Sequence, residues 1–302
     1  MKKNPHNIAI LSSSPLMMML GIKLQKDGHR VKVFDFSKNI GGAWTWYQKN
    51  NNHNEKIPKY TNIINPYNQK EVRFTDKMNS FLKKEFKIKI KKTKKKFDIN
   101  YNYKNKFIYN FDFFFDYASK KLKFIRKFIS KIETLQNGKV KINNKFIFDK
   151  VFIPSFSGVK SIKIHNKRIF YPEKKEIVSE HLSIIAKKFK LQNFYYSQFF
   201  DEHFDRVKIE KLKKYYCLTA RLDHSIKGTK TFKLKKFYIE KFLKKSDLIN
   251  IKVSKFHNYY RNKNQLSDLK DVIKNSNIKY VDTTQFMSGF YSLRKILNVN
   301  KL

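Results

Sequence analysis

The sequence has a single cysteine, Cys217, among its 302 residues. One thiol cannot form an intrachain disulfide, and a reducing compartment is therefore expected. No apolar run reaches the roughly 18 residues that a membrane-spanning helix needs. The segment from Ile8 to Leu24 is apolar and follows two lysines, but it lacks a small-residue cleavage site and leads into a polar strand, unlike a signal peptide. These absences predict a soluble, cytoplasmic protein.

Acidic residues are scarce as well, with 24 against 67 lysines and arginines, for a formal net charge of +43. Such an excess is typical of proteins that bind polyanions. Only eight of the basic residues are arginine, however, the side chain whose planar fork reads phosphate and guanine bidentately. The lysines are spread along the whole chain, as an AT-rich coding bias would leave them. No specific nucleic-acid partner is expected, and a selected polyanion-binding surface is the alternative.

Clusters of metal-ligating residues are also missing from the sequence. The eight histidines are dispersed, with no H-x-x-x-H motif and no cysteine cluster, so no metal site is expected. The chain is rich in apolar side chains: 41% of its residues are hydrophobic and 16% are aromatic. These fractions exclude a disordered protein, and the length suffices for one or two packed domains.

The first 35 residues predict a strand–helix–strand unit. Residues 7–11 form a short apolar run suited to a buried parallel strand, and the turn from Ser12 to Pro15 leads into a helix over residues 16–26. Gly28 stands where a helix C-terminus favours glycine, and residues 31–35 form the second strand. Together they occupy about 30 residues, the size of one βαβ crossover.

The rest of the chain predicts a mixture of helices and strands. The strongest short signal is Asn137-Gly138 between two apolar runs, which is typical of a β-hairpin. Strands are expected at residues 86–90, 132–135, 139–142, 146–153, 204–222 and 248–260. Helices are expected at residues 75–86, 111–129, 176–191, 266–274 and 290–297, and an extended loop at 45–72.

Two stretches of the chain, taken together, carry a resemblance to a known family. In the first, Asp35 ends the second strand 23 residues after Ser12, and Gly41-Gly42-Ala43-Trp44 follows a few residues later. In the second, the hairpin is followed by an apolar strand over residues 148–154. The pattern resembles the flavin-containing amine oxidase superfamily of FAD/NAD(P)-binding flavoproteins, which includes UDP-galactopyranose mutase. Acidic residues in such a unit follow the first motif position by about 20 residues.

The chain departs from this family at the glycine motif. The three positions of G-x-G-x-x-G fall on Ser12, Ser14 and Met17. The first glycine normally permits a tight turn, the second lets the backbone approach the pyrophosphate, and the third lets helix and strand pack closely. Serine is small and its hydroxyl can donate to phosphate, whereas methionine adds a long side chain at the third position. The helix N-terminus itself still offers N–H groups to an anion.

The resemblance implies a set of cofactor-binding residues for FAD. Asp35 would hydrogen-bond the adenosine ribose, and Gly41 and Gly42 would line the ribityl and phosphate region, with Ala43 and Trp44 beside them. An ordinary strand-end acid and an ordinary Gly-Gly turn are the alternatives. Trp44 and Trp46 would stack on flavin or sugar, or would pack in the core. Ser288-Gly289 weakly resembles the family's C-terminal flavin contact.

The sequence therefore predicts an α/β protein with a Rossmann-like FAD/NAD(P)-binding domain and a smaller substrate-side region. The cofactor-binding core is expected to comprise residues 1–75 and 115–160, plus 270–302, and the substrate side or cap residues 76–114 and 161–269. The functional hypothesis is an amine oxidase-like, FAD-dependent oxidoreductase or mutase-type flavoenzyme acting on a small organic or sugar-nucleotide substrate. The alternatives are a catalytically inactive relative with a binding or scaffold role, and a lysine-rich nucleic-acid-binding protein. No catalytic residue is assigned.

Overall fold

The computed structural model describes most of the chain in a series of segments. They are residues 4–37, 40–41, 47–50, 53–58, 63–64, 69–93, 106–155, 157–164, 167–171, 174–190, 195–197, 204–211, 214–222, 240–261 and 263–283.

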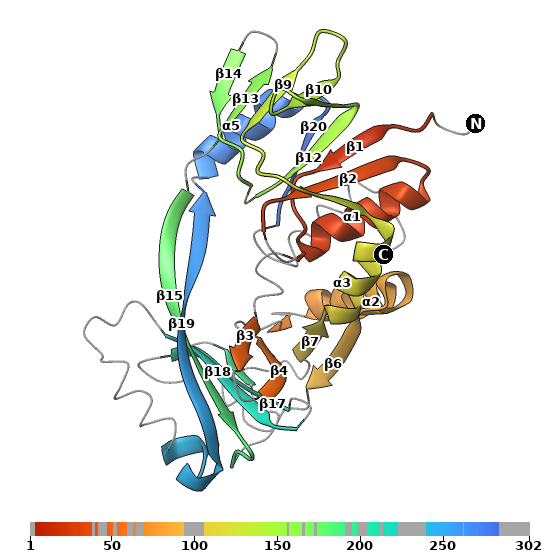
Figure 1. Ribbon diagram of the computed structural model, residues 1–302. Helices are drawn as coiled ribbons and strands as arrows, with labels where there is room; N and C mark the ends of the chain where they lie inside the picture. Colours follow the sequence, from red (N-terminus) through yellow and green to blue (C-terminus); the bar gives the residue numbers. More distant parts are fainter. Residues whose placement is uncertain are drawn as a thin grey trace.

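The centre of the fold is a sheet of five parallel strands (Figure 1). Their order is β20-β12-β1-β2-β8, and each neighbouring pair is parallel. The strands are β1 (Asn7–Ile10), β2 (Arg30–Asp35), β8 (Lys123–Arg126), β12 (Lys150–Pro154) and β20 (Ile278–Val281). The predicted α/β class and its initial βαβ unit are confirmed, since β1 and β2 flank helix α1 (Pro15–Lys26).

Both faces of this sheet are buried, and alternate side chains of β1 show how. Ile8 and Ile10 belong to a core formed with α1, α2 (Gln69–Phe86) and α3 (Asp112–Lys121). Ala9 and Leu11 point to the opposite face and belong to a second core. This alternation is the period of two expected of a strand covered on both sides. An apolar run without polar interruption is therefore required at β1.

The second core lies between the central sheet and a smaller sheet with helix α5 (Lys263–Ile273). The smaller sheet has the order β11-β10-β9-β13-β14. Its strands are β9 (Lys131–Thr134), β10 (Val140–Ile142), β11 (Phe146–Phe148), β13 (Ser161–Ile164) and β14 (Lys167–Phe170). The predicted hairpin is confirmed: β9 and β10 pair antiparallel, and Gly138 in their turn has a φ of +77°, which suits glycine.

A third five-stranded sheet is built around two long antiparallel strands, β15 (Lys174–Ala186) and β19 (Leu248–Arg261), which extend from beside α5 towards the opposite end of the molecule (Figure 1). Its order is β16-β17-β18-β15-β19, and short 3-10 helix η2 (Lys245–Asp247) precedes β19. The remaining strands of this sheet are β16 (Tyr195–Ser197), β17 (Phe204–Lys211) and β18 (Tyr216–Leu222). Smaller sheets are formed by β3 (Tyr47–Asn50) with β4 (His53–Pro58), and by β5 (Ile63–Ile64), β7 (Lys106–Asn110) and β6 (Lys89–Thr93).

The helix predicted over residues 176–191 is wrong, because this segment is strand β15. Leu182 and Ile184 enter one apolar core, while Ile185 lies in another with Cys217. That alternation belongs to a strand, and β15 pairs along its length with β19. Several of its apolar residues also fit a helical spacing, so the local pattern alone could not choose between the two periods.

Two other predicted elements have different bounds in the structure. The helix expected over residues 111–129 ends at Lys121, and residues 123–126 become strand β8 because they pair with β2 in the central sheet. The segment 45–72, expected to be a loop, contains strands β3, β4 and β5 and the start of α2. The closing helix expected over residues 290–297 lies outside the described residues.

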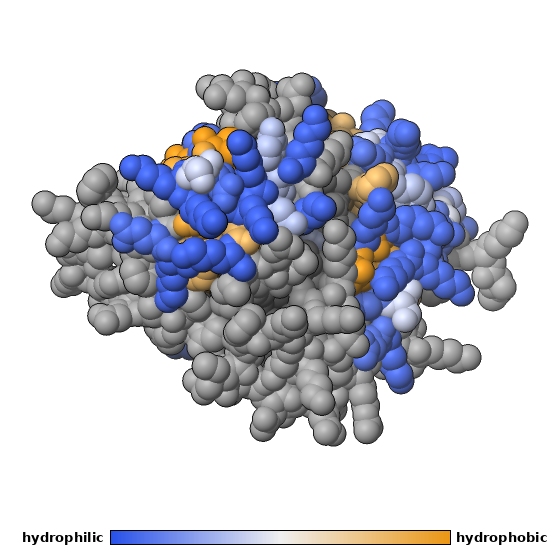
Figure 2. All heavy atoms as spheres, turned by 90° about the horizontal axis from the view of Figure 1, so that it is seen from below, coloured by the Kyte–Doolittle hydropathy of each residue, from blue (hydrophilic) through white to orange (hydrophobic). Residues whose placement is uncertain are grey.

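Exposed lysines occur on helices and strands throughout the described part of the chain, for example Lys26, Lys84, Lys121, Lys163 and Lys252. In the view of Figure 2 most of the described surface is hydrophilic, with small apolar areas between the charged side chains. None of the helices in the described segments combines the length and apolarity that crossing a membrane requires.

Candidate functional site at the carboxyl edge of the central sheet

The carboxyl ends of the five parallel strands lie along one edge of the central sheet. The chain order of the strands reverses at β1, which lies between β2 on one side and the much later β12 on the other. In open parallel sheets, ligands bind outside the carboxyl edge at such a switch point. The residues following β1, β2, β8, β12 and β20 are therefore the ones from which a site would be built.

Ser13 and Asp35 connect the ends of β1 and β2. The backbone N–H of Ser13 donates to Asp35 Oδ2 at 2.7 Å, and the Ser13 hydroxyl donates to the same oxygen at 2.5 Å. The Ser13 hydroxyl oxygen also accepts a hydrogen bond from the Gly41 N–H at 2.8 Å. One buried hydroxyl thus joins the β1–α1 turn, the acid of β2 and the turn that contains Gly41.

These contacts limit what Asp35 can still bind. A carboxylate has about four acceptor positions. Ser13 occupies two on Oδ2, and the Ser37 N–H takes one on Oδ1 at 2.7 Å. About one position therefore remains for a ligand hydroxyl, on Oδ1.

Ser12 and Ser14 form the turn that leads into helix α1. The Ser14 N–H donates to the Ser12 hydroxyl at 3.0 Å, and Ser14 is the N-cap residue with extended backbone. The Ser14 hydroxyl makes no cap hydrogen bond, and within the described residues its buried oxygen has no partner. The first turn of α1 contains no acid and has Pro15 at its start, so no side-chain carboxylate of that turn occupies the helix N-terminus, a position that favours an anion.

Met17, at the position of the third motif glycine, is fully buried in the core between α1 and the sheet. The close approach of helix and strand occurs one turn later, at Gly21. A Cβ atom at Gly21 would lie 3.1 Å from Ile10 Cδ1 and 3.1 Å from Leu122 Cδ2. The packing role of the missing glycine is therefore filled by Gly21, and Met17 contributes apolar volume instead.

At the other side of β1, Ser155 joins the ends of β12 and β20. The Ser155 hydroxyl donates to Asp282 Oδ1 at 3.1 Å and accepts from the Tyr280 hydroxyl at 2.8 Å and the Thr283 N–H at 2.7 Å. Ser155 is fully buried. This network holds the carboxylate of Asp282 at the same edge of the sheet as Asp35.

Comparison with known proteins identifies this arrangement at the level of the fold. No protein-family model and no curated protein sequence matches the chain. Among solved structures, cyclohexylamine oxidase from Brevibacterium oxydans IH-35A superposes with a TM-score of 0.63 and 8% identity, covering 99% of this chain and 100% of the oxidase. An engineered putrescine oxidase gives a TM-score of 0.64 at 8% identity, covering 98% of each chain. A flavin-dependent halogenase, CmlS, matches with a TM-score of 0.46 and 12% identity; 98% of this chain is covered, but only 57% of the halogenase.

The chain has the fold of the amine oxidases. At 8% identity this likeness is one of fold, and it carries no statement about substrate. It places the βαβ unit with Ser12, Ser14 and Asp35 in the Rossmann-like part of an amine oxidase-like architecture.

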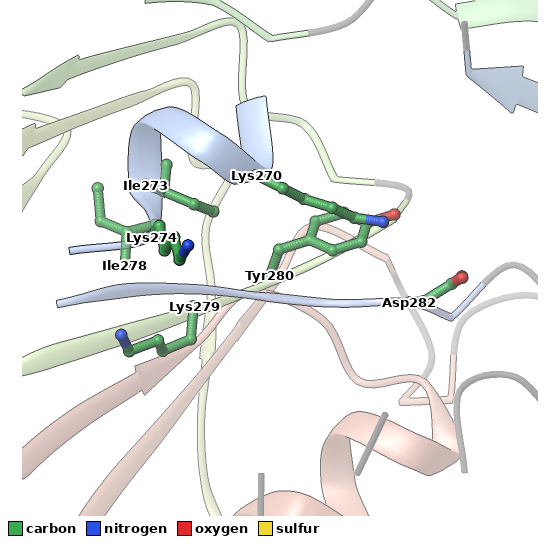
Figure 3. Close-up of a pocket in the computed structure, with 7 residues that line it drawn as sticks. All are labelled: Lys270, Ile273, Lys274, Ile278, Lys279, Tyr280 and Asp282. Carbon is green, nitrogen blue, oxygen red and sulfur yellow. The ribbon is translucent and has the colours of Figure 1, made fainter. Parts of the chain in front are cut away.

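A shallow cavity of about 310 Å³ lies beside β20, at one end of the amine oxidase-like central sheet. It is lined by Lys270, Ile273, Lys274, Ile278, Lys279, Tyr280 and Asp282. In Figure 3 the Lys270 side chain extends along the Tyr280 ring, and its ammonium group lies 5.1 Å from the ring centroid. Asp282 stands apart, at the end of β20 (Figure 3). The cavity thus reaches the carboxyl edge only through Asp282 and Tyr280.

The structure brings four of the predicted site residues, Ser12, Ser14, Asp35 and Gly41, to the carboxyl edge, whereas Met17 lies in the core. Gly42, Ala43 and Trp44, together with Trp46, Ser288 and Gly289, lie outside the described residues. Among the described residues, no three His, Cys, Asp or Glu side chains are grouped closely enough to hold a metal ion.

Sequence reasoning missed Ser13, Gly21, Ser155 and Asp282. Asp282 follows an apolar strand as Asp35 does, and that pattern was a usable signal. The hydroxyls of Ser13 and Ser155 gave no such sequence signal, because their hydrogen-bond partners are distant in the chain.

Proposed function

We propose that this chain is an FAD-binding, amine oxidase-like oxidoreductase or mutase-type flavoenzyme that acts on a small organic or sugar-nucleotide substrate. The observation that carries the proposal is the carboxyl edge of the central sheet. There Asp35 ends β2, the N-terminus of α1 faces the same edge, and the Ser14 hydroxyl is buried without a partner in the described part of the chain. A dinucleotide cofactor requires these two features, an acid for ribose and an anion site for pyrophosphate.

Each residue has a defined task in this proposal. The first-turn N–H groups of α1 and the Ser14 hydroxyl would bind the pyrophosphate, and the remaining acceptor position of Asp35 would take one ribose hydroxyl. Ser13 is a positioning residue, because its hydroxyl holds Asp35 and the Gly41 turn in one arrangement. FAD would supply the capacity to accept and return a hydride, and the protein would orient it against the substrate. We assign no catalytic base.

We also propose that residues 1–75, 115–160 and 270–302 form the cofactor side and that residues 76–114 and 161–269 form the substrate side. Shared cores modify this division: β13, β14 and α5 group with the cofactor side through residues such as Ile162 and Leu269, and α2 and α3 do so through residues such as Met78 and Phe114. A cytoplasmic location is proposed because the chain has a single cysteine, Cys217, which is buried and cannot form an intrachain disulfide.

The deciding test is the visible absorption spectrum of the protein purified without added cofactor, followed by titration with FAD. A flavin spectrum, or saturable binding of FAD with a rise in the unfolding temperature, is the expected result. A colourless protein that FAD neither binds nor stabilises would overturn the proposal. Ser14 provides a specific check: Ser14→Val should weaken FAD binding, because it replaces the unpartnered hydroxyl with methyl groups, whereas Ser14→Thr should retain it.

A second candidate function is a catalytically inactive relative that retains the fold for binding or as a scaffold. It is favoured by the three hydrogen bonds that the chain itself makes to Asp35, which leave about one acceptor position where two ribose hydroxyls would compete. Saturable FAD binding with no reduction of the flavin by any amine or sugar-nucleotide substrate would support this function over the first.

A further inference from the structure

Two exposed phenylalanines meet just beyond the ends of β2 and β8. The Phe36 and Phe128 ring centroids are 5.6 Å apart with the ring planes at 75°, an edge-to-face contact. Phe36 is 60% exposed and Phe128 is 44% exposed. Single exposed apolar residues are ordinary, but a pair in mutual contact at the ligand-binding edge of a parallel sheet is a candidate binding surface.

The strands themselves place this pair beside Asp35. In the register of the central sheet Asp35 is opposite Arg126, and the Lys127 N–H continues the pairing by donating to the Asp35 carbonyl oxygen at 3.0 Å. Phe36 directly follows Asp35, so the two α-carbons are only about 3.8 Å apart. Backbone hydrogen bonds therefore hold the pair at the same strand end as Asp35, with the Phe36 and Asp35 side chains leaving opposite faces of the extended strand.

Gly158, after β12, lets the Phe128 ring lie where it does. A Cβ atom at this position would lie 2.4 Å from Phe128 Cε2 and 2.9 Å from two further ring atoms. Any side chain at residue 158 would push the ring aside. The backbone after β12 thus packs directly against the Phe128 ring at the carboxyl edge.

We propose that Phe36 and Phe128 form a stacking platform for the adenine base of a ligand that contains adenosine diphosphate. This inference deepens the proposed cofactor site, and it names two residues of this chain that neither the glycine motif nor the resemblance assigns. Aromatic faces bind nucleobases by stacking, and most of the Phe36 surface is open to a ligand. A base on the platform would leave its ribose to reach across the end of β2 to the remaining acceptor position of Asp35. Exposed Arg126 and Lys127 directly precede Phe128 in the chain and add positive charge near the strand end, which suits the negative charge of such a ligand; the Lys127 ammonium lies 5.3 Å from the Phe146 ring centroid.

The test uses ADP as the probe, because ADP contains the adenine, the ribose and the two phosphates but no flavin. Binding of ADP and of FAD is measured by calorimetry for the full chain, for the double variant F36L/F128L and for the control F170L. Phe170 is 72% exposed on β14, in a different sheet, so its substitution matches the loss of exposed aromatic surface at another place. Because Phe36 and Phe128 are exposed, the double variant should keep the unfolding temperature of the unmodified protein.

The expected result is that F36L/F128L binds ADP and FAD about tenfold or more weakly, which is the size of one stacked base, while F170L binds both as the unmodified protein does. Equal ADP affinity of the double variant and the unmodified protein would overturn the platform, as would an unmodified protein that does not bind ADP. ADP binding that is weakened in F36L/F128L, together with no binding of FAD, would support the platform and overturn the proposed function. Tight FAD binding that is equal in F36L/F128L and the unmodified protein would overturn the platform and support the proposed function.

Discussion

Ser13 donates two hydrogen bonds, one from its backbone and one from its hydroxyl, to a single carboxylate oxygen of Asp35. The two residues are 22 positions apart in the chain, and they join the first two strands of the central sheet at its carboxyl edge. The acid that the family resemblance assigns to ribose binding is therefore also a structural group, held by its own protein. Any ligand at Asp35 binds a carboxylate whose position is already determined.

Ser13→Ala should lower the free energy of unfolding by about 2–3 kcal/mol. The substitution removes a hydrogen bond to a carboxylate and leaves the Gly41 N–H without its acceptor. Chemical denaturation measures the loss. Ser37→Ala is the matched control, because Ser37 binds Asp35 through its backbone N–H, which alanine keeps. Equal stability of Ser13→Ala and Ser37→Ala would show that the hydroxyl contributes nothing.

Met17→Gly, which restores one glycine of the motif, should destabilise the protein by roughly 3–6 kcal/mol. The estimate combines the loss of a large core side chain, about 2–5 kcal/mol, with about 1 kcal/mol for glycine inside a helix. Met17 is fully buried. The conservative Met17→Leu should cost less than about 1.5 kcal/mol. A Met17→Gly protein as stable as the unmodified one would mean that the core at α1 does not depend on this side chain.

Gly21→Val should destabilise the protein by about 1–3 kcal/mol through overpacking. The new side chain would meet Ile10 and Leu122, whose nearest atoms lie 3.1 Å from an added Cβ. A double-mutant cycle with Leu122→Ala checks the cause. The cost of Gly21→Val should be smaller in the Leu122→Ala background, because part of the obstructing side chain is gone. Strictly additive effects would place the origin of the loss elsewhere.

Tyr109→Phe should cost about 1–3 kcal/mol at neutral pH, because the buried Tyr109 hydroxyl donates to Asn79 Oδ1 at 2.6 Å and phenylalanine leaves that oxygen unpaired. Burial raises the pKa of Tyr109 well above its usual 10.0. The unfolded chain therefore loses this proton first, and the contribution of Tyr109 to stability declines as pH rises above about 10.

The stability difference between the unmodified protein and Tyr109→Phe should accordingly shrink between pH 9 and pH 11. Denaturation at a series of pH values measures it. A difference that stays constant over this range would contradict the raised pKa, while leaving the hydrogen bond itself in place.

Much of the fold around the central sheet was predictable from local sequence. The apolar run of β1, the turn of serines, the helix ended near Gly28 and the strand ended by Asp35 all appear as expected. The hairpin at Gly138 followed from two residues. In each case a short stretch of sequence determines its own local structure. Burial on both faces requires an uninterrupted apolar strand, and a tight turn requires a backbone conformation that glycine adopts freely.

The candidate site was predictable only in part. Asp35 was identified by its place at the end of a strand, but the use of its oxygens by Ser13 and Ser37 was not, since hydroxyl partners leave no periodic signal. The shift of the close helix contact from residue 17 to Gly21 was equally hidden. It depends on where Ile10 and Leu122, from two other elements, meet the helix.

The amino-acid sequence by itself determined the βαβ unit, its acid and the loss of the three glycines, because these features arise within about 35 consecutive residues. Only the tertiary structure decided that residues 174–186 form a strand, since their apolar spacing fits two periods and pairing with β18 and β19 selects one. It also brought Phe36 to Phe128 and Ser155 to Asp282. Contacts between residues more than 90 positions apart depend on how whole helices and strands pack against one another. Local sequence patterns do not predict that packing.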